Sequence, residues 1–155
     1  MMSAPTLVLR PASPEDADAI RGLVRAAYAR WVPVIGREPM PMNADYDQAV
    51  REHDIELAYL GPELAGLIET MPRDDHLWIE NVAVSPQQQG KGLGRRLLAR
   101  AESKAVATGH RELRLLTNAA FAANVTLYQK VGYVIDRSEP FMGGTTLYMS
   151  KTLTT

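Results

Sequence analysis

The chain has 155 residues, with 46% hydrophobic and 23% charged side chains, and this composition predicts one globular domain, residues 1–155, with its own core. It holds 17 basic and 18 acidic residues, and this balance disfavours a nucleic-acid partner, which usually requires a basic excess. The absence of cysteine excludes disulfides, thiolate metal sites and a cysteine nucleophile.

The first third of the chain predicts one strand and two helices. Residues 6–12 alternate apolar and polar side chains, as a strand does. Residues 13–31 predict a helix, because Ser13 suits the N-cap, Pro14 the first helical position, and Ile20, Leu23, Val24, Ala27 and Tyr28 form one apolar face. Three prolines and a glycine make residues 32–42 a long loop, and residues 44–53 predict a short helix.

The rest of the chain predicts six further strands and two helices. A turn at residues 61–63 joins a hairpin of residues 55–60 and 64–71, and Pro86 ends a third strand of residues 76–86. Helices are expected at 93–109 and 118–132, and strands at 112–117, 133–138 and 145–153. The resulting order, β-α-α-β-β-β-α-β-α-β-β, predicts an α/β fold with a mixed sheet flanked by helices.

The segment SPQQQGKGLGRRLL, residues 85–98, predicts an anion site between a strand and a helix. Glycines let the backbone approach a ligand, and a helix N-terminus offers free N–H groups to a phosphate. A P-loop is excluded because no Gly-Lys-Ser/Thr is present, and a dinucleotide fingerprint is excluded because the sixth position from Gly90 is Arg95. The alternative is a flexible turn without a ligand.

Two segments resemble the signatures of the GNAT N-acetyltransferase superfamily. Residues 89–94, QGKGLG, are similar to its acetyl-coenzyme A motif Q/R-x-x-G-x-G/A, and residues 124–134, NVTLYQKVGYV, resemble a second signature in which a helix ends in Y-x-K-x-G-F/Y. Phe121 departs from the pattern, since many members have asparagine seven positions before the tyrosine. The resemblance implies a single GNAT-type domain that transfers an acetyl or longer acyl group from acetyl-CoA to a primary amine by direct attack in a ternary complex.

The resemblance also implies two catalytic residues, and each has an alternative structural role. Glu80 is the expected base acting through water, with a raised pKa if it is buried in the strand. Strict alternation places Trp78, Glu80, Val82 and Val84 on one face of this strand, so the alternative is a solvent-facing residue. Tyr128 is the expected acid toward the thiolate, and the alternative is core packing at helical spacing.

The cofactor is expected to bind mainly through main-chain groups. The resemblance implies that the pantetheine arm pairs with the strand like an added neighbour and that the Val82 N–H donates a hydrogen bond to the oxyanion. Asn124 and Asn118 are the two candidates for the place of the missing family asparagine, the alternatives being that neither contacts the cofactor and that Asn118 caps the helix. The expected cofactor residues are Val82, Ala83, Val84, Gln89, Gly90, Lys91, Gly92, Leu93, Gly94, Arg95 and Asn124.

The acceptor is expected between the first two helices, where family folds bind it. The candidates are Tyr28, Trp31, Arg37, Met42 and Tyr46, although Tyr28 and Trp31 could instead close the core. A small-molecule or peptide amine is the expected partner, and a homodimer is common in the family. The three scattered histidines predict no metal site.

The sequence also bears on the location of the protein in the cell. No apolar run reaches the length of a membrane span, and residues 1–19 lack the pattern of a secretory signal, so we expect a soluble, cytoplasmic protein with no membrane partner. Two other functions remain open. One is a non-catalytic CoA-binding regulatory module, and the other is a nucleotide-binding domain.

Overall fold

The computed structural model describes residues 6–154 and contains one seven-stranded mixed sheet. The strand order is β1-β2-β3-β4-β5-β7-β6, in which only the β4–β5 pair is parallel. The predicted α/β class is confirmed, and the order of the elements agrees with the prediction except for one additional short helix, α2. The elements are β1 (Leu7–Pro11), α1 (Ala17–Tyr28), α2 (Val32–Ile35), α3 (Tyr46–Glu52), β2 (Asp54–Leu60), β3 (Glu63–Pro72), β4 (Leu77–Val84), α4 (Leu93–Ala107), β5 (Glu112–Asn118), α5 (Ala122–Lys130), β6 (Val134–Phe141) and β7 (Gly144–Thr152).

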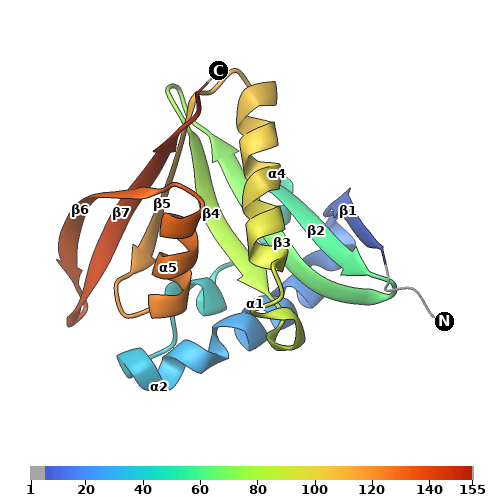
Figure 1. Cartoon of the computed structure of the whole chain (residues 1–155). Helices are drawn as coiled ribbons and strands as arrows, with labels where there is room; N and C mark the ends of the chain where they lie inside the picture. The colour runs from blue at the N-terminus through green and yellow to red at the C-terminus, as the bar shows by residue number, and fades with distance from the viewer. Residues whose placement is uncertain (1–5, 155) are drawn as a thin grey trace.

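The helices form a layer on each face of the sheet (Figure 1). One core lies under α4 and α5 and includes Leu97, Leu113 and Tyr128. The other lies between α1, α3 and strands β2 to β4 and includes Val24, Tyr46 and Leu67. Burial of these two apolar sets on opposite faces makes a three-layer domain.

The segment predicted as a loop, residues 32–42, contains short helical turns, and that part of the prediction is wrong. Pro33 stands in the first turn of α2, where its fixed φ suits a helix, and Gly36 ends the turn at φ 74°. A 3₁₀ turn, η3 (Met40–Asn43), follows with Pro41 near its start. Proline therefore lies at the start of two helical turns here, although its presence had predicted a loop.

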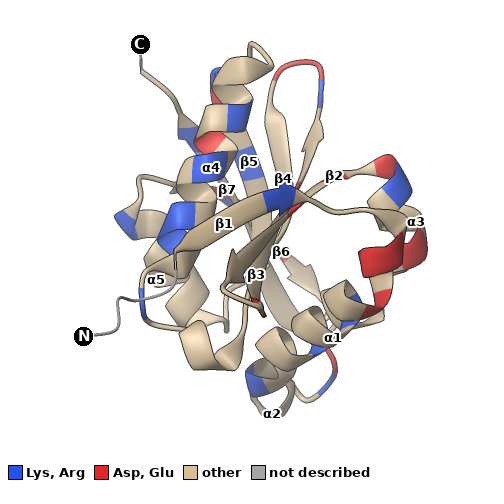
Figure 2. Ribbon diagram, turned by 90° about the vertical axis from the view of Figure 1, so that its right-hand side faces the viewer, with Lys and Arg blue, Asp and Glu red and all other residues tan. Residues whose placement is uncertain are grey.

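Charge is distributed unevenly over the helices (Figure 2). Acidic side chains gather on α3, and basic side chains follow α4. Residues 1–5 and 155, which belong to the predicted domain, lie outside the described residues, and residues 1–5 are also part of the segment considered for a secretory signal.

Candidate functional site

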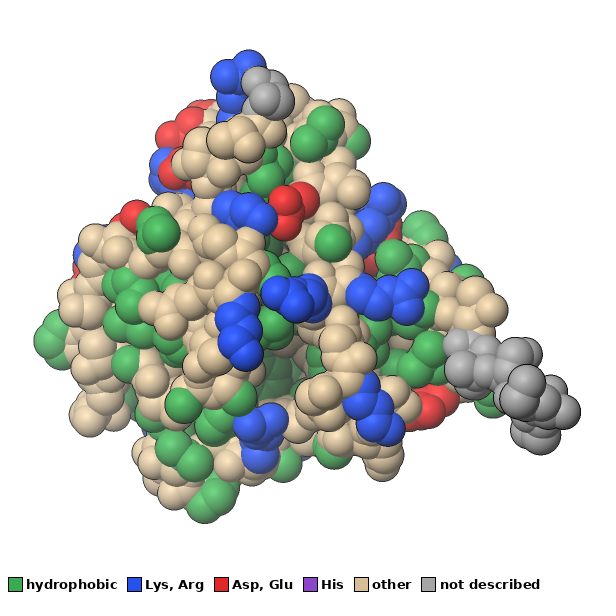
Figure 3. Space-filling model, viewed as in Figure 1, with side chains coloured by type: hydrophobic (Ala, Val, Ile, Leu, Met, Phe, Trp, Pro, Cys, Tyr) green, Lys and Arg blue, Asp and Glu red, His purple; other side chains and the backbone are tan. Residues whose placement is uncertain are grey.

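The main pocket lies where the end of α1, strand β4, the start of α4 and helix α5 meet. Lys and Arg side chains surround the middle of the molecular face that carries α4 and α5 (Figure 3). The pocket is lined by Ala27, Tyr28, Arg30, Trp31, Val82, Ala83, Val84, Gln88, Gln89, Gly90, Gly92, Gly94, Arg95, Ala123, Asn124, Leu127 and Tyr128. Nine of the predicted cofactor residues are in this set, together with Tyr28, Trp31 and Tyr128 from the other predictions.

Separation of β4 from β5 opens the pocket. The two strands pair only at Leu77 with Leu113 and at Trp78 with Arg114, and they diverge toward the end of β4 (Figure 1). The C-terminal half of β4 therefore has an open edge on the β5 side. An extended ligand can pair with such an edge through main-chain hydrogen bonds.

The register of β3 and β4 shows which main-chain groups face this open edge. The Ser85 N–H donates to the Ala65 carbonyl across the two strands at 2.8 Å. Hydrogen-bonded and non-hydrogen-bonded pairs alternate along an antiparallel ladder, so Val84 and Val82 fall in non-hydrogen-bonded pairs with β3. The N–H and C=O groups of both valines therefore point toward the β5 side.

A β-bulge at Glu80 corrects the predicted faces of this strand. Glu69 pairs with Asn81 and Thr70 with Ile79, so Glu80 is an extra residue in β4. The bulge shifts the alternation by one, and Ile79 and Val82 both contact the core under α4. Glu80 does not share an uninterrupted face with Val82, because strict alternation cannot cross a bulge. Its side chain is exposed, so the strand does not bury this carboxyl.

The glycine loop places the N-terminus of α4 at the pocket. Gly90 and Gly92 have φ values of 77° and 90°, in the left-handed region that favours glycine. Gly92 is the N-cap of the 15-residue helix and has no side chain to bind the first N–H groups. A Cβ on Gly94 would stand 3.0 Å from Leu127 Cδ2, so this glycine lets α4 approach α5 closely. The loop thus offers free amides and a positive helix end to an anion.

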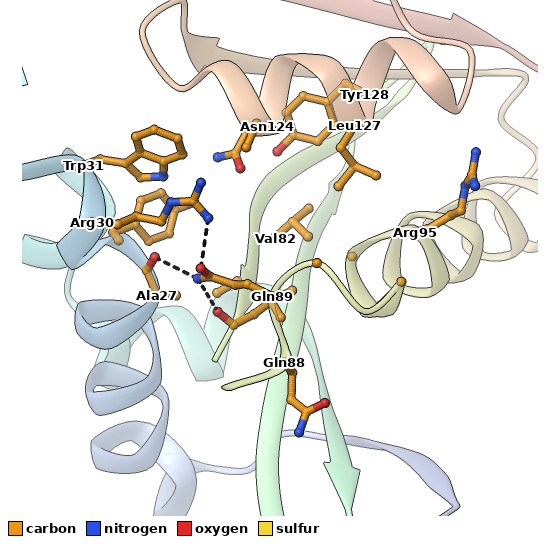
Figure 4. A pocket seen from close by; sticks show the side chains of 17 residues that line it. Ala27, Arg30, Trp31, Val82, Gln88, Gln89, Arg95, Asn124, Leu127 and Tyr128 are labelled. Carbon is orange, nitrogen blue, oxygen red and sulfur yellow. Dashed lines mark hydrogen bonds between the residues drawn. The ribbon is translucent and has the colours of Figure 1, made fainter. Parts of the chain in front are cut away.

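Gln89 connects the glycine loop to two neighbouring elements. Its Nε2 donates to the Val84 carbonyl at 3.0 Å and to the Ala27 carbonyl at 3.3 Å. Its Oε1 accepts from Arg30 Nη1 at 2.9 Å (Figure 4). These contacts fix the position of the loop relative to α1 and β4.

Among the other predicted loop residues, Lys91 is exposed and does not line the pocket. Leu93 packs into the core, so only its main chain is left for a ligand.

Helix α5 contributes Asn124 and Tyr128. The Tyr128 hydroxyl points toward the pocket, near Asn124 and Leu127 (Figure 4). Burial raises the pKa of Tyr128 to about 12. Asn124 lines the pocket, whereas Asn118 lies before α5 and its Oδ1 accepts from the Ala120 N–H at 2.9 Å. Asn118 thus stabilises a turn, and Asn124 is the asparagine placed to meet a ligand.

A polar cluster lies on the α1 and α3 side of the bulge. Tyr28 donates from its hydroxyl to Asn81 Oδ1 at 2.8 Å, and Asn81 Nδ2 donates to the Tyr46 hydroxyl at 3.2 Å. Glu69, opposite Asn81, lies 2.6 Å from His53 Nδ1 through its Oε2. Burial raises the pKa of Glu69, and the Glu80 carboxylate raises it further, while His53 lowers it. Beside the bulge, Glu69 is therefore a buried carboxyl with a raised pKa, and the sequence analysis did not propose it as a base.

The predicted acceptor residues do not all lie in the pocket. Tyr28 and Trp31 line the pocket, and Trp31 stacks on Phe121 with ring centroids 4.9 Å apart. Tyr46 and Met42 are buried in the core, outside the pocket lining. Arg37 lies over the Phe141 ring at the tip of the β6–β7 hairpin, 5.6 Å from its centroid. Phe121, which stands where many family members have asparagine, thus packs against Trp31, one of the predicted acceptor residues.

Sequence reasoning missed five residues of the pocket lining: Ala27, Arg30, Gln88, Ala123 and Leu127. Arg30 stands next to the predicted Trp31, but an arginine at the end of a surface helix normally faces solvent, so its sequence position carried no signal. Within residues 6–154, no three His, Asp or Glu side chains are grouped to hold a metal ion, and none of the helices is long and apolar enough to cross a membrane.

Comparison with known proteins decides the family. The sequence model described as the acetyltransferase (GNAT) family matches residues 20–133. The chain belongs to the GNAT acetyltransferase family. No curated protein sequence matches the chain significantly.

Solved structures share the GNAT fold over almost the whole chain. PaiA N-acetyltransferase from Thermoplasma acidophilum, in complex with coenzyme A, covers 95% of this chain and 99% of its own, at 19% identity and a TM-score of 0.81. The ribosomal-protein-S18-alanine N-acetyltransferase from Escherichia coli covers 97% and 96%, at 19% identity and a TM-score of 0.77. A GNAT acetyltransferase from Elizabethkingia anophelis with acetyl-CoA bound covers 95% and 98%, at 20% identity and a TM-score of 0.67. At these identities the likeness shows the fold alone.

Proposed function

We propose that this GNAT protein transfers an acetyl group from acetyl-CoA to a primary amine by direct attack in a ternary complex. The observation that carries the proposal is one continuous pocket that joins three features. These are the open N-terminus of α4, the open edge of β4 and the Tyr128 hydroxyl. An anion site, an extended main-chain edge and a proton donor suit the pyrophosphate, pantetheine and thioester of this donor, respectively.

The donor residues would act mainly through the backbone. In this proposal the amides of Gly90 to Arg95 bind the pyrophosphate, and the main-chain groups of Val82 and Val84 pair with the pantetheine amides. Both valines are oriented for this, since their polar groups point away from β3. Asn124 lines the same pocket and would bind the pantetheine arm from α5.

The reaction forms a C–N bond and breaks the C–S bond of the thioester. A primary amine is mostly protonated at neutral pH, so it first loses a proton, which we assign to Glu80 through water. The neutral amine attacks the carbonyl, and the Val82 N–H stabilises the oxyanion. The tetrahedral intermediate then expels the CoA thiolate, which receives a proton from Tyr128. The acylated nitrogen loses its second proton to solvent.

The acceptor would approach from the side of the polar cluster. Glu80 is exposed and lies beside Asn81, which Tyr28 binds. Carboxylates at Glu80 and Glu69 favour a cationic amine over a neutral or anionic partner. A small-molecule or peptide amine fits this charge. The name of the Escherichia coli neighbour describes a protein alanine acceptor for that enzyme, and a peptide N-terminus therefore belongs in the panel of test amines.

Calorimetry with acetyl-CoA and a thiol assay of CoA release over a panel of amines test the proposal. We expect acetyl-CoA binding and amine-dependent CoA release that falls on Glu80→Gln, with Glu63→Gln, at the exposed start of β3, as the control. Absence of acetyl-CoA binding at millimolar ligand would refute the donor. Binding without release by any amine, and without an effect of Glu80→Gln, would instead indicate a non-catalytic CoA-binding module.

A further inference from the structure

The pocket wall formed by the end of α1 carries a cationic side chain, Arg30, that lies outside both family signatures. Two of the described residues that line the pocket are charged, and both are arginines. Arg95 belongs to α4, and Arg30 belongs to the 3₁₀ turn η2 (Ala29–Trp31) after α1. Figure 4 shows the two side chains on different walls of the pocket. A pocket with two guanidinium groups and no lining carboxylate suits an anionic ligand.

Arg30 is held in place by two neighbours. Its guanidinium lies over the Trp31 ring, 4.3 Å from the centroid, and Trp31 itself stacks on Phe121 at an interplanar angle of 21°. Its Nη1 donates to Gln89 Oε1 at 2.9 Å. Gln89 in turn binds the carbonyls of Ala27 and Val84. The guanidinium is therefore positioned before any ligand arrives, which reduces the entropy that binding must overcome.

These contacts leave the charge of Arg30 without an acidic partner among the described residues. Its hydrogen-bond partner is the neutral amide of Gln89. Other arginines differ, since Arg100 binds Glu56 and Arg25 binds Glu38. A guanidinium has five N–H donors in a planar fork that matches phosphate oxygens, and Gln89 uses one Nη1 donor. Further donors remain for a ligand in the pocket.

We propose that Arg30 binds the pyrophosphate of coenzyme A from the α1 wall, across from the amides of the Gly90–Arg95 loop. The inference rests on the proposed function, because it takes acetyl-CoA as the donor. The hydrogen bond to Gln89, the residue before Gly90, places the Arg30 guanidinium at the start of that loop. A diphosphate held between loop amides and Arg30 would also link η2 to α4. Arg30 thus adds a binding residue for the donor that the family motif does not contain.

The test compares two ligands that share the pantetheine arm. Coenzyme A is titrated in its 3′-dephospho form, which carries the pyrophosphate as its phosphate group, and pantetheine carries no phosphate. Titrations followed by NMR measure dissociation constants up to the millimolar range for both ligands. The variants are Arg30→Gln, which removes the charge but keeps a polar side chain, and Arg30→Lys, which retains the charge without the fork. Arg111→Gln, an exposed arginine outside the pocket lining, is the matched control for net charge.

We expect Arg30→Gln to raise the Kd of coenzyme A on the order of tenfold to a hundredfold, as for loss of hydrogen bonds to a charged group. The Kd of pantetheine should stay within about twofold of the wild-type value. For coenzyme A, the Kd of Arg30→Lys should lie between those of wild type and Arg30→Gln, and the Kd of Arg111→Gln should match that of wild type. An equal loss for both ligands would show that Arg30 only supports the shape of the pocket, and an unchanged Kd for coenzyme A would show no contact. Either result overturns the inference while wild-type binding keeps the proposed donor. Failure of the wild-type protein to bind coenzyme A would refute the donor itself.

Discussion

The position of the Tyr128 side chain is compatible with both of the roles that the sequence presented as alternatives. It packs in the core under α4 and α5, and its hydroxyl also points toward the pocket. Because burial raises its pKa to about 12, the phenol keeps its proton throughout the neutral range. The phenol is therefore available, in the proposed reaction, as a proton donor throughout the neutral range. Core packing here keeps the proposed acid protonated and in a fixed orientation.

Replacement of Tyr128 by Phe tests the assigned role with little change in shape. We expect kcat to fall on the order of a hundredfold, since general acid catalysis typically contributes 10²–10⁴. The Kd of coenzyme A should change less than about twofold, because the proposed phosphate and pantetheine contacts involve other residues. Steady-state CoA release and calorimetry measure the two quantities.

The pH profile of the wild-type enzyme provides the control for Tyr128. A tyrosine with a pKa of about 12 predicts no loss of kcat from its ionisation up to roughly pH 10. Undiminished turnover of Tyr128→Phe, measured where chemistry limits the rate, would remove the tyrosine from the mechanism.

At the scale of elements, the sequence predicted every strand and the four main helices, because their signals are local. Apolar and polar alternation, helix-capping residues and glycines at helix ends predicted β1 to β7 and α1, α3, α4 and α5. The bulge at Glu80 was not predictable in this way, since it depends on the register of β4 against β3. The same holds for the partnership of Glu69 with His53 and the placement of Arg30. These contacts join residues distant in the chain, and neither periodicity nor spacing encodes them.

The start of α4 allows a matched test of the glycine loop. Gly92 and Gly109 both have positive φ, 90° and 78°, and a Cβ on either would meet open space. Substitution by Ala should therefore destabilise the protein by a similar amount at both positions, about 1 kcal/mol, through backbone strain. Only Gly92→Ala should also weaken coenzyme A binding, because only Gly92 lies in the pocket.

Chemical denaturation and calorimetry on the two glycine variants separate these effects. Equal loss of coenzyme A affinity in both variants would mean that general destabilisation, and not the loop geometry, controls binding.

The contact between α4 and β2 predicts a pH-dependent stability. Glu56 accepts from Arg100 at 2.8 and 3.0 Å and lies 2.8 Å from Lys104, and these cations lower the pKa of the carboxyl against its burial. The folded-state pKa is below the unfolded value, so the ion pair stabilises the protein above that value, near 4.5, and the stabilisation is lost as the pH falls below it. Glu56→Gln should reduce the free energy of unfolding at pH 7 by about 1–2 kcal/mol, because Arg100 is partly exposed and solvent screens the pair.

Urea denaturation of wild type and Glu56→Gln at pH 7 and pH 4 measures this effect. The difference between the two proteins should narrow at the lower pH, and a difference independent of pH would exclude the charge of Glu56 as its cause.

At the scale of the whole molecule, the pocket lies between the two cores. Its lining comes from α1 and η2, which belong with the core of β2 to β4, and from α4 and α5, which cover the other face. The Trp31–Phe121 stack and the Arg30–Gln89 hydrogen bond already connect these parts. A ligand in the pocket would add further contacts to both parts.

Coenzyme A should therefore stabilise segments on both sides of the pocket, not only the glycine loop. At a free concentration of 100 times Kd, binding adds about 2.7 kcal/mol to the free energy of unfolding, which raises Tm by roughly 5–10 °C for a domain of this size. Hydrogen exchange should slow in α1 and η2, in the start of α4 and in α5, while the β1–β2 edge, which contributes no lining residue, should change least. Protection confined to the loop and α4 would mean that the ligand rests on α4 alone, without engaging Arg30, Asn124 or Tyr128. Protection of both sides requires that the ligand join the two cores, because the residues that hold it come from helices on opposite faces of one sheet.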